Sequence, residues 1–220
     1  MKSHRPFKNA IYQQLARIGK ATASPPRLEL LDLLSQAPRT VEALAQESSQ
    51  SVANTSRHLQ VLRAARLVEA EKSGLFVTYR LADEEVADFF RSLRLLAEAR
   101  LAEIERFTRE YVWDRETMEA VDRDALRERV KRGEVVVLDV RPVEEYQAGH
   151  IPGARSIPWK ELESRLGEIP ADQEVVAYCR GPYCLFAVEA VELLRSRGFK
   201  ATRLDDSLAD WRAHGMDVQT

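Results

Sequence analysis

The sequence predicts two domains of different fold class: a mainly α domain that contains a two-stranded hairpin, then a small α/β domain with a central parallel sheet. Three observations predict this division. Apolar residues recur at helical spacing through the first part of the 220-residue chain. A pair of short helices and an alternating hairpin follow there, whereas buried-type Val and Leu runs alternate with helices later in the chain. We place the domains at residues 1–111 and 117–220, with a polar boundary at 112–117.

Composition excludes several classes of protein. The chain is 45% hydrophobic and 31% charged, with nine glycines and nine prolines, which excludes disordered and low-complexity scaffolds. No apolar run approaches the roughly 20 residues of a bilayer span, and no hydrophobic region follows the basic start. Two cysteines cannot form a disulfide framework. We therefore expect a soluble cytoplasmic protein without a secretory signal and with no membrane partner.

Charge is distributed unevenly along the chain. Residues 1–82 carry 12 Lys and Arg against 6 Asp and Glu, whereas residues 112–220 carry 16 against 21. A basic end on an acidic chain indicates a polyanion partner, most simply nucleic acid. A scatter of solvated charges is the alternative.

The first domain has signals for helices and a hairpin in an informative order. A helix is expected from Phe7 to Ile18, ending at Gly19, and a buried helix over 28–34. Thr40 is the expected N-cap of a helix over 41–46, and Ser51 of the next one. That second helix should turn Thr55, Leu59 and Leu62 inward. The hairpin turns at 72–74, and together these elements predict a winged helix-turn-helix.

Residues 83–111 contain no Gly or Pro and predict one long helix. An apolar stripe recurs along it at three- and four-residue steps, at Val86, Phe90, Leu93, Ala97, Leu101, Ile104 and Tyr111. Such a helix would be about 42 Å long, longer than a small domain, so its stripe needs a partner. A second copy of the chain is the economical partner. Packing on its own C-terminal half is the alternative.

Cys179 is the residue of the second domain most suited to chemistry. It follows the expected strand 175–178 and precedes a helix that ends at Gly198. Backbone N–H groups, a helix dipole and the adjacent Arg180 all favour a thiolate at such a place. Ligands of open α/β sheets bind at this edge. A buried, inert cysteine is the alternative reading.

The second domain resembles a single-domain rhodanese over residues 117–220. The resemblance is carried by Leu138-Asp139-Val140-Arg141, Glu145-Tyr146, Gly149-His150-Ile151-Pro152-Gly153, Tyr178-Cys179-Arg180, and Trp211 with Gly215 and Val218. It implies a Cys179 persulfide that is formed from a sulfur donor and passed to an acceptor. The active-site loop would then include Arg180, Gly181 and Tyr183. The resemblance assigns a structural role to Asp139, Arg141, Glu145 and His150.

The expected active-site loop departs from the family pattern at two places. Its fourth position is Pro182, where the family has Gly, and its sixth is Cys184, where the family has a basic or hydroxyl residue. Loss of the cation weakens the capture of an anionic donor such as thiosulfate. Cys184 either resolves the persulfide as a second thiol or is a small apolar residue of the helix. Because Leu185 rather than Arg follows, phosphatase and arsenate-reductase chemistry is disfavoured.

The first domain resembles the ArsR/SmtB family of winged-helix repressors. Residues 51–68 and the hairpin carry this resemblance, which implies a symmetric dimer on double-stranded operator DNA. We expect contacts to bases and phosphates from Ser51, Asn54, Ser56, Arg57 and Gln60 on the helix and from Lys72 and Arg80 on the wing. A solvated polar face is the alternative. Many relatives hold a metal, but Cys and His are absent from the places they use, so we expect neither a metal nor a cofactor.

Together these features predict a DNA-binding transcriptional regulator that responds to sulfane sulfur or thiol redox state through Cys179. The expected partners are operator DNA, a small sulfur donor, and a second copy bound through the N-terminal helix and the 83–111 helix. A rhodanese-type sulfurtransferase, localised or dimerised by its winged helix, is the alternative from another class. A DNA-binding module with an inactive rhodanese is the third.

Overall fold

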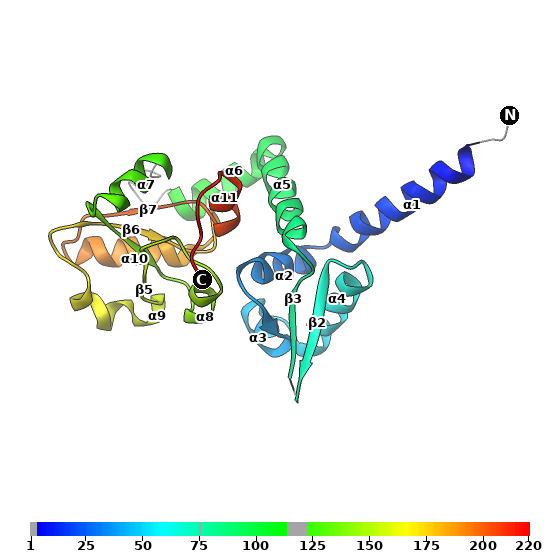
Figure 1. Cartoon of the computed structure of the whole chain (residues 1–220), viewed down its shortest axis with the longest axis horizontal. Coiled ribbons are helices and arrows are strands. Elements are labelled where there is room, and N and C mark those ends of the chain that lie inside the picture. The colour runs from blue at the N-terminus through cyan, green and yellow to red at the C-terminus, as the bar shows by residue number, and fades with distance from the viewer. Residues whose placement is uncertain (1–3, 75, 114–122) are drawn as a thin grey trace. The chain divides into compact units, whose positions relative to one another are not determined.

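The computed structural model of the chain describes residues 4–74, 76–113 and 123–220. They form two compact units, the first ending at Phe90 and the second starting at Arg91. Each unit has its own sheet (Figure 1). Each unit also has its own buried hydrophobic clusters. The predicted start of the second domain, at 117, and most of the predicted boundary at 112–117 lie outside the described residues. No helix within the described ranges is long and apolar enough to cross a membrane.

The first unit is the predicted winged helix-turn-helix. Its elements are α1 (Arg5–Thr22), α2 (Pro25–Gln36), β1 (Arg39–Thr40), α3 (Val41–Glu47), α4 (Val52–Ala64), β2 (Val68–Ser73) and β3 (Phe76–Leu81). The strands form an antiparallel sheet in the order β1-β3-β2. The Thr40 hydroxyl accepts a hydrogen bond from the Ala43 N–H, and the Ser51 hydroxyl accepts one from the Asn54 N–H. These caps start α3 and α4 where the sequence predicts.

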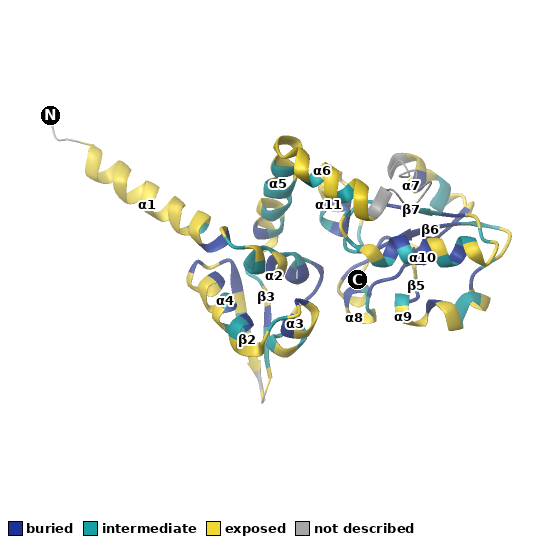
Figure 2. Ribbon diagram, turned by 180° about the vertical axis from the view of Figure 1, so that it is seen from behind, coloured by how far each residue is buried: buried dark blue, intermediate teal, exposed yellow. Residues whose placement is uncertain are grey.

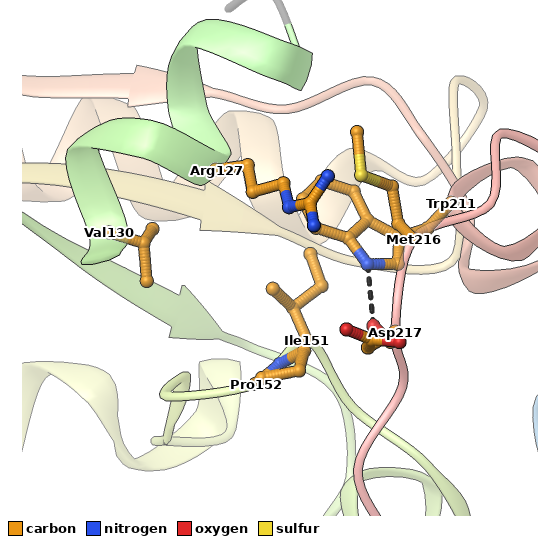
Figure 3. A pocket seen from close by; sticks show the side chains of 7 residues that line it. All are labelled: Arg127, Val130, Ile151, Pro152, Trp211, Met216 and Asp217. Carbon is orange, nitrogen blue, oxygen red and sulfur yellow. Dashed lines mark hydrogen bonds between the residues drawn. The ribbon is translucent and has the colours of Figure 1, made fainter.

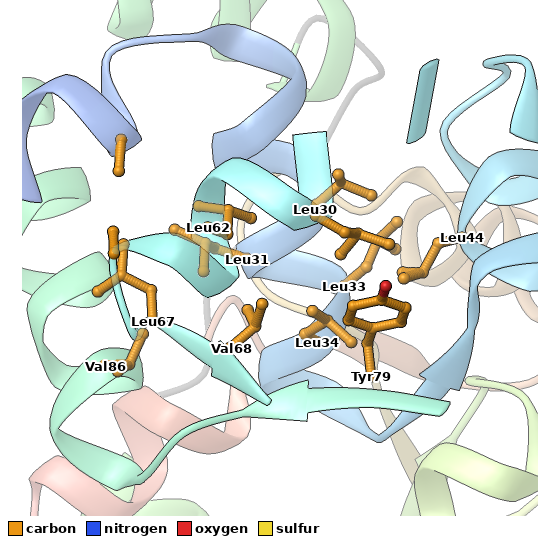
Figure 4. Close-up of a cluster of buried hydrophobic side chains, with 13 residues drawn as sticks. Leu30, Leu31, Leu33, Leu34, Leu44, Leu62, Leu67, Val68, Tyr79 and Val86 are labelled. Carbon is orange, nitrogen blue, oxygen red and sulfur yellow. The ribbon is translucent and has the colours of Figure 1, made fainter. Parts of the chain in front are cut away.

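The core of this unit is a cluster of leucines from the helices, packed against the wing (Figure 4). Leu30, Leu31 and Leu44 are fully buried, and Val68 and Tyr79 contribute from the hairpin. Helix α4 buries its inner face, formed by Thr55, Leu59 and Leu62, as predicted. The opposite face of α4 is therefore left in solvent.

Helix α1 is joined to this core only at its end. It continues through Gly19, the predicted end, to Thr22, because one glycine inside a helix costs only about 1 kcal/mol. Its buried residues are Ala21 and Thr22. Phe7, Ile11 and Leu15 are 68%, 47% and 61% exposed, and Figure 2 shows α1 exposed along most of its length.

The predicted continuous helix over 83–111 is wrong. The structure has α5 (Glu84–Arg100), α6 (Ala102–Thr108) and a π-helix, η1 (Arg109–Trp113). Leu101 separates the first two with an extended backbone, at φ −114° and ψ 96°. No Gly or Pro marks this break, but charge does: Arg100 lies in the last turn of α5 and Glu103 in the first turn of α6. Opposite charges at these positions favour a helix end followed by a helix start.

The second unit contains the predicted parallel sheet. Its further elements are α7 (Arg123–Lys131), β4 (Val135–Asp139), α8 (Val143–Ala148), β5 (Arg155–Ser156), α9 (Trp159–Leu162), the 3-10 helix η2 (Glu163–Glu168), β6 (Glu174–Tyr178), α10 (Leu185–Ser196), β7 (Ala201–Arg203) and α11 (Leu208–Ala213). The strand order is β5-β4-β6-β7, and each pairing is parallel. Every residue of β4 is buried, as the run of Val and Leu predicts.

Apolar side chains pack on both faces of this sheet. One cluster joins Val175, Ala177 and Cys179 to α10, and the other joins Val176 and Tyr178 to α7 and α11. The alternation along β6 follows from the two-residue period of a strand. Cys179 therefore lies at the carboxyl edge of the sheet, on the side that α10 covers.

Candidate functional site

Cys179 and Cys184 close the predicted active-site loop with a disulfide. Cys179 follows β6 directly, and Cys184 is the N-cap residue of α10. Their Cα atoms lie 6.2 Å apart, within the range that a disulfide spans. The Cys184 N–H donates to the Gly181 carbonyl over 3.1 Å, which tightens the loop into a turn. The loop thus joins the two thiols that the sequence placed at its first and sixth positions.

Gly181 is required by the shape of this loop. Its φ of +128° is a conformation that side-chain-bearing residues rarely adopt. A Cβ built on it would lie 3.2 Å from the Cβ of Ser207, the N-cap residue of α11. The loop therefore packs directly against the start of α11.

The two cysteines differ in their exposure to solvent. Cys179 is 1% exposed and belongs to the apolar cluster under α10, whereas Cys184 is partly buried at the rim of that cluster. In this disulfide form Cys179 is neither ionised nor open to a ligand. The thiolate expected from the sequence belongs to the reduced loop and stays a prediction.

Arg180 is paired within the fold. Its Nε donates to Glu145 Oε1 over 2.9 Å, and the Glu145 side chain is fully buried. Because this pairing balances the guanidinium charge, Arg180 favours the ionisation of Cys179 less than an unpaired arginine would. Glu145 lies on α8, so the ion pair also fixes the loop to that helix.

Buried charges hold the carboxyl ends of β4 and β6 together. The Arg141 Nε donates to Asp139 Oδ1 over 3.0 Å, its Nη2 donates to the Gly149 carbonyl over 2.7 Å, and both charged side chains are 0% exposed. Burial lowers the pKa of Arg141, but the hydrogen bond and charge of Asp139 raise it overall. The Tyr178 hydroxyl also donates to Asp139, and burial together with that carboxylate raises the Tyr178 pKa. Tyr178 immediately precedes Cys179.

His150 is fixed beside these charges. Its ring stacks on Tyr146 with the centroids 3.8 Å apart, and its Nδ1 lies 2.9 Å from the Tyr146 carbonyl oxygen. The four residues to which the sequence assigned a structural role thus surround the base of the loop.

The active-site loop also contacts α5, which sequence reasoning missed. The Tyr183 hydroxyl donates to Glu98 Oε1 over 2.6 Å, and Arg94 Nη1 donates to the same oxygen over 3.0 Å. Arg94 also bonds Asp210 Oδ1, to which Arg91 Nε donates over 2.9 Å. The only local signals are the Arg94–Glu98 spacing and the Ser207–Asp210 capping box.

Asp210 is the buried centre of this contact. It is 5% exposed and accepts hydrogen bonds from the backbone and hydroxyl of Ser207. Burial raises the pKa of Asp210, but the hydrogen bonds from Ser207 and the positive charges of Arg94 and Arg91 hold it below its usual value. The carboxylate is therefore ionised at neutral pH.

A small cavity lies on the face of the sheet opposite Cys179. This small cavity of about 100 Å³ is lined by Arg127, Val130, Ile151, Pro152, Trp211, Met216 and Asp217 (Figure 3). The Trp211 Nε1–H donates to the Asp217 carbonyl over 2.8 Å, which fastens the C-terminal segment to α11. Trp211 and Ile151 belong to the cluster opposite Cys179, so this cavity is separate from the loop.

The residues expected to contact DNA lie on the outer side of α4. Arg57 and Gln60 are exposed, and Ser56 is partly buried. Ser51 caps the helix, and the Asn54 Nδ2 donates to Gln50 Oε1 over 2.9 Å. The helix thus brings the predicted residues to one face.

The wing presents two further basic residues. Lys72 is exposed on β2, and Arg80 is exposed on β3. Arg80 is paired with Glu69, its direct neighbour across the hairpin. A phosphate would have to compete with this carboxylate for Arg80. Among the described residues, no three His, Cys, Asp or Glu side chains are grouped as metal ligands.

Comparisons with known proteins match both units. The model of the arsR family of bacterial regulatory proteins matches residues 24–70, and that of the rhodanese-like domain matches residues 122–214. The HTH-type transcriptional regulator Rv0324 of Mycobacterium tuberculosis is 44% identical over 211 residues, which cover 96% of this chain and 92% of that protein. The chain belongs to the ArsR family. It is a transcriptional regulator of that family fused to a rhodanese-like domain.

Each half of this ArsR-family regulator has relatives of its own. A sulfurtransferase of Allochromatium vinosum is 30% identical over 100 residues, covering 44% of this chain and 92% of that protein. The solution structure of a homodimeric winged helix-turn-helix DNA-binding domain from Mycobacterium bovis is 40% identical. It covers 46% of this chain and 92% of that one, with a TM-score of 0.43.

Proposed function

We propose that this ArsR-family regulator binds operator DNA as a homodimer with an affinity set by the sulfur state of Cys179 and Cys184. The observation that carries the proposal is the closure of the rhodanese loop by these two cysteines. The family pattern has no second thiol at this place in the loop. A chain that contains both a DNA-reading helix and a closable thiol pair is suited to convert sulfur chemistry into a change of DNA affinity.

The DNA-binding part of the proposal rests on α4 and α1. Arg57 and Gln60 project from α4 into solvent, where they can contact guanine and adenine edges in a major groove. Phe7, Ile11 and Leu15 form an exposed apolar stripe on α1, and a second copy of the chain is the occupant we assign to it. A two-fold dimer would place two α4 helices on successive half-sites.

The chemical part requires only a sulfane sulfur donor. In the reduced loop, the Cys179 thiolate attacks the terminal sulfur of a persulfide RS–SH, which gives Cys179–S–SH and releases RS⁻. The Cys184 thiolate then attacks the Cys179 sulfur, which forms the disulfide and releases HS⁻. The two electrons that the cysteines lose reduce the sulfane sulfur to hydrosulfide, so no other oxidant takes part.

A test compares DNA affinities at fixed salt for the dithiol-reduced and the persulfide-treated full chain. The probe is a duplex that the reduced protein selects from random-sequence DNA. The expected change is about 5- to 150-fold, the usual range of coupling between two sites. Cys184→Ser should stop at the persulfide and lose most of this change, and mass spectrometry of the 179–184 peptide should show the retained sulfur. Equal affinities, with the disulfide shown to form, would refute the proposal.

A sulfurtransferase is the second candidate, favoured by the rhodanese match and the similarity to the sulfurtransferase of A. vinosum. Cys184 opposes it, because an intramolecular thiol removes the persulfide before an external acceptor can. Transfer of sulfur from thiosulfate to cyanide distinguishes the two candidates. Turnover that Cys179→Ser abolishes and Cys184→Ser leaves unchanged would support the enzyme. Turnover that rises in Cys184→Ser would support the resolving role.

A further inference from the structure

We infer that Tyr183, Glu98, Arg94 and Asp210 form a relay through which closure of the Cys179–Cys184 loop controls helix α5. This inference rests on the proposed function and names the residues that would carry its coupling. All four residues belong to the second unit. They form an unbroken chain of hydrogen bonds from the loop to α5 and on to α11. We call this set the Tyr183 relay.

Tyr183 is the link that closure of the loop can move. It directly precedes Cys184, so the disulfide restricts its backbone on one side and Gly181, packed on Ser207, restricts it on the other. Tyr183 is 47% exposed and borders an open cleft of about 560 Å³. Its backbone belongs to the loop, and its hydroxyl is bonded to Glu98. Opening the disulfide releases the loop backbone on the Cys184 side of Tyr183.

Glu98 and Arg94 transmit the position of Tyr183 to α5. They are one helical turn apart on that helix, and their ion pair shares the Glu98 oxygen that Tyr183 contacts. Arg94 is 13% exposed at its side chain, so it cannot exchange its partners freely for water. If the Tyr183 hydroxyl moves away, Glu98 loses that hydrogen-bond donor. The balance of Arg94 between the Glu98 and Asp210 carboxylates then changes.

Asp210 anchors the other end of the relay. It accepts from Arg91 and Arg94 and is held in turn by both donors of Ser207, the residue against which Gly181 packs. The loop thus reaches α5 by two routes, directly through Tyr183 and through the start of α11. Helix α5 begins at Glu84, and its Val86 belongs to the core of the winged-helix unit. A change at residues 91–100 therefore acts on a helix that both units share.

Hydrogen exchange of residues 91–100 tests the relay without reference to DNA. In the full wild-type chain, we expect reduction of the disulfide to lower amide protection of this segment. In Tyr183→Phe and Glu98→Gln, protection should be low in both redox states. Tyr111→Phe and Glu103→Gln make the same changes at exposed positions outside the relay and should behave as wild type. Unchanged wild-type protection on reduction would overturn the inference.

DNA binding then separates the relay from the proposed function. If the relay holds, Tyr183→Phe and Glu98→Gln still form the disulfide, seen by mass spectrometry, but the ratio of their DNA affinities in the two redox states falls to within about 2-fold. If the variants keep the full wild-type ratio, the relay is refuted and the proposed function stands. If the wild type binds DNA equally well in both redox states while the amide protection of its α5 still changes, the proposed function fails and the relay stands.

Discussion

Arg141 shows what a single residue does for this fold. Its guanidinium is fully buried and bound to Asp139 and to the Gly149 carbonyl, so one side chain connects the end of β4 to the segment that follows α8. A buried pair of this kind is not strongly stabilising by itself, but removal of one partner leaves a buried charge alone. The residues next to Cys179 depend on this arrangement, since Tyr178 shares the same carboxylate.

Arg141→Met should therefore destabilise the second unit by about 3–5 kcal/mol. Urea unfolding followed by tryptophan fluorescence measures this, because all three tryptophans lie beyond residue 112. Arg197→Met is the matched control, since it removes an exposed ion pair with Glu163, which is expected to contribute no more than about 1 kcal/mol. Equal losses in the two variants would contradict the role given to the buried pair.

Arg57 is the residue that tests how DNA is read. We expect Arg57→Ala to weaken binding to the selected duplex by about 1–3 kcal/mol, the range of one good contact to a base pair. Fluorescence anisotropy at fixed salt gives the affinity. Arg197→Ala removes an equal charge from the second unit. If Arg57 acts through a specific contact and not through its charge alone, this variant should keep its affinity within about 2-fold of wild type. Similar losses for both would show that Arg57 adds no specific contact.

At the scale of elements, the contact between α5 and α11 depends on one ionised carboxylate. Asp210 has a lowered pKa, so its folded form holds its charge to a more acidic pH than the unfolded chain does. Its stabilising contribution is therefore complete above the ordinary Asp pKa of about 3.9 and is lost as the pH falls through the lower folded value.

Asp210→Asn should remove this pH dependence. At neutral pH we expect the variant to be less stable by about 1.5–3 kcal/mol, because hydrogen bonds to a charged group are lost. As the pH falls below about 4, the stability of wild type should approach that of the variant. Unfolding free energies from pH 3 to 7 check this. A constant difference between the two curves would show that the Asp210 charge is not what stabilises the contact.

Local signals predicted the elements better than they predicted contacts between them. Thr40 and Ser51 cap helices where a short hydroxyl side chain predicts a cap, and the Val-rich run of β4 predicts a buried parallel strand. No Gly or Pro marks the break at Leu101, so the spacing of apolar residues alone predicts one continuous helix there.

In the candidate site too, the sequence predicted local neighbours but not contacts between distant elements. The sequence placed Cys179 and Cys184 on one loop because the strand, the loop and the helix are consecutive. It could not show that Arg180 is paired with Glu145, 35 residues away, or that Arg94 reaches Asp210 across 116 residues. Such pairs depend on how distant elements pack, and charged side chains alone do not indicate their partners.

At the scale of the whole molecule, the exposed stripe of α1 predicts the assembly. Leu15→Glu places a charge in this stripe and should convert the dimer to a monomer at micromolar concentration, as measured by sedimentation velocity. Gln13→Glu adds the same charge on the opposite face of the same helix, where the side chain is also exposed, and should leave the dimer intact. A dimeric Leu15→Glu protein would show that the two copies meet elsewhere.

The burial of Cys179 bears on how long a response lasts. Cys179 is 1% exposed, and its partner Cys184 is the more exposed of the two residues. Because a disulfide sulfur has no thiolate, peroxide oxidises it less readily than a free thiol, and a cellular dithiol reaches the pair more easily at Cys184. Gene control through this pair would therefore outlast the pulse that triggered it. Under the proposed function, the response would end when a reductant opens the disulfide, and it would not follow the sulfide concentration from moment to moment.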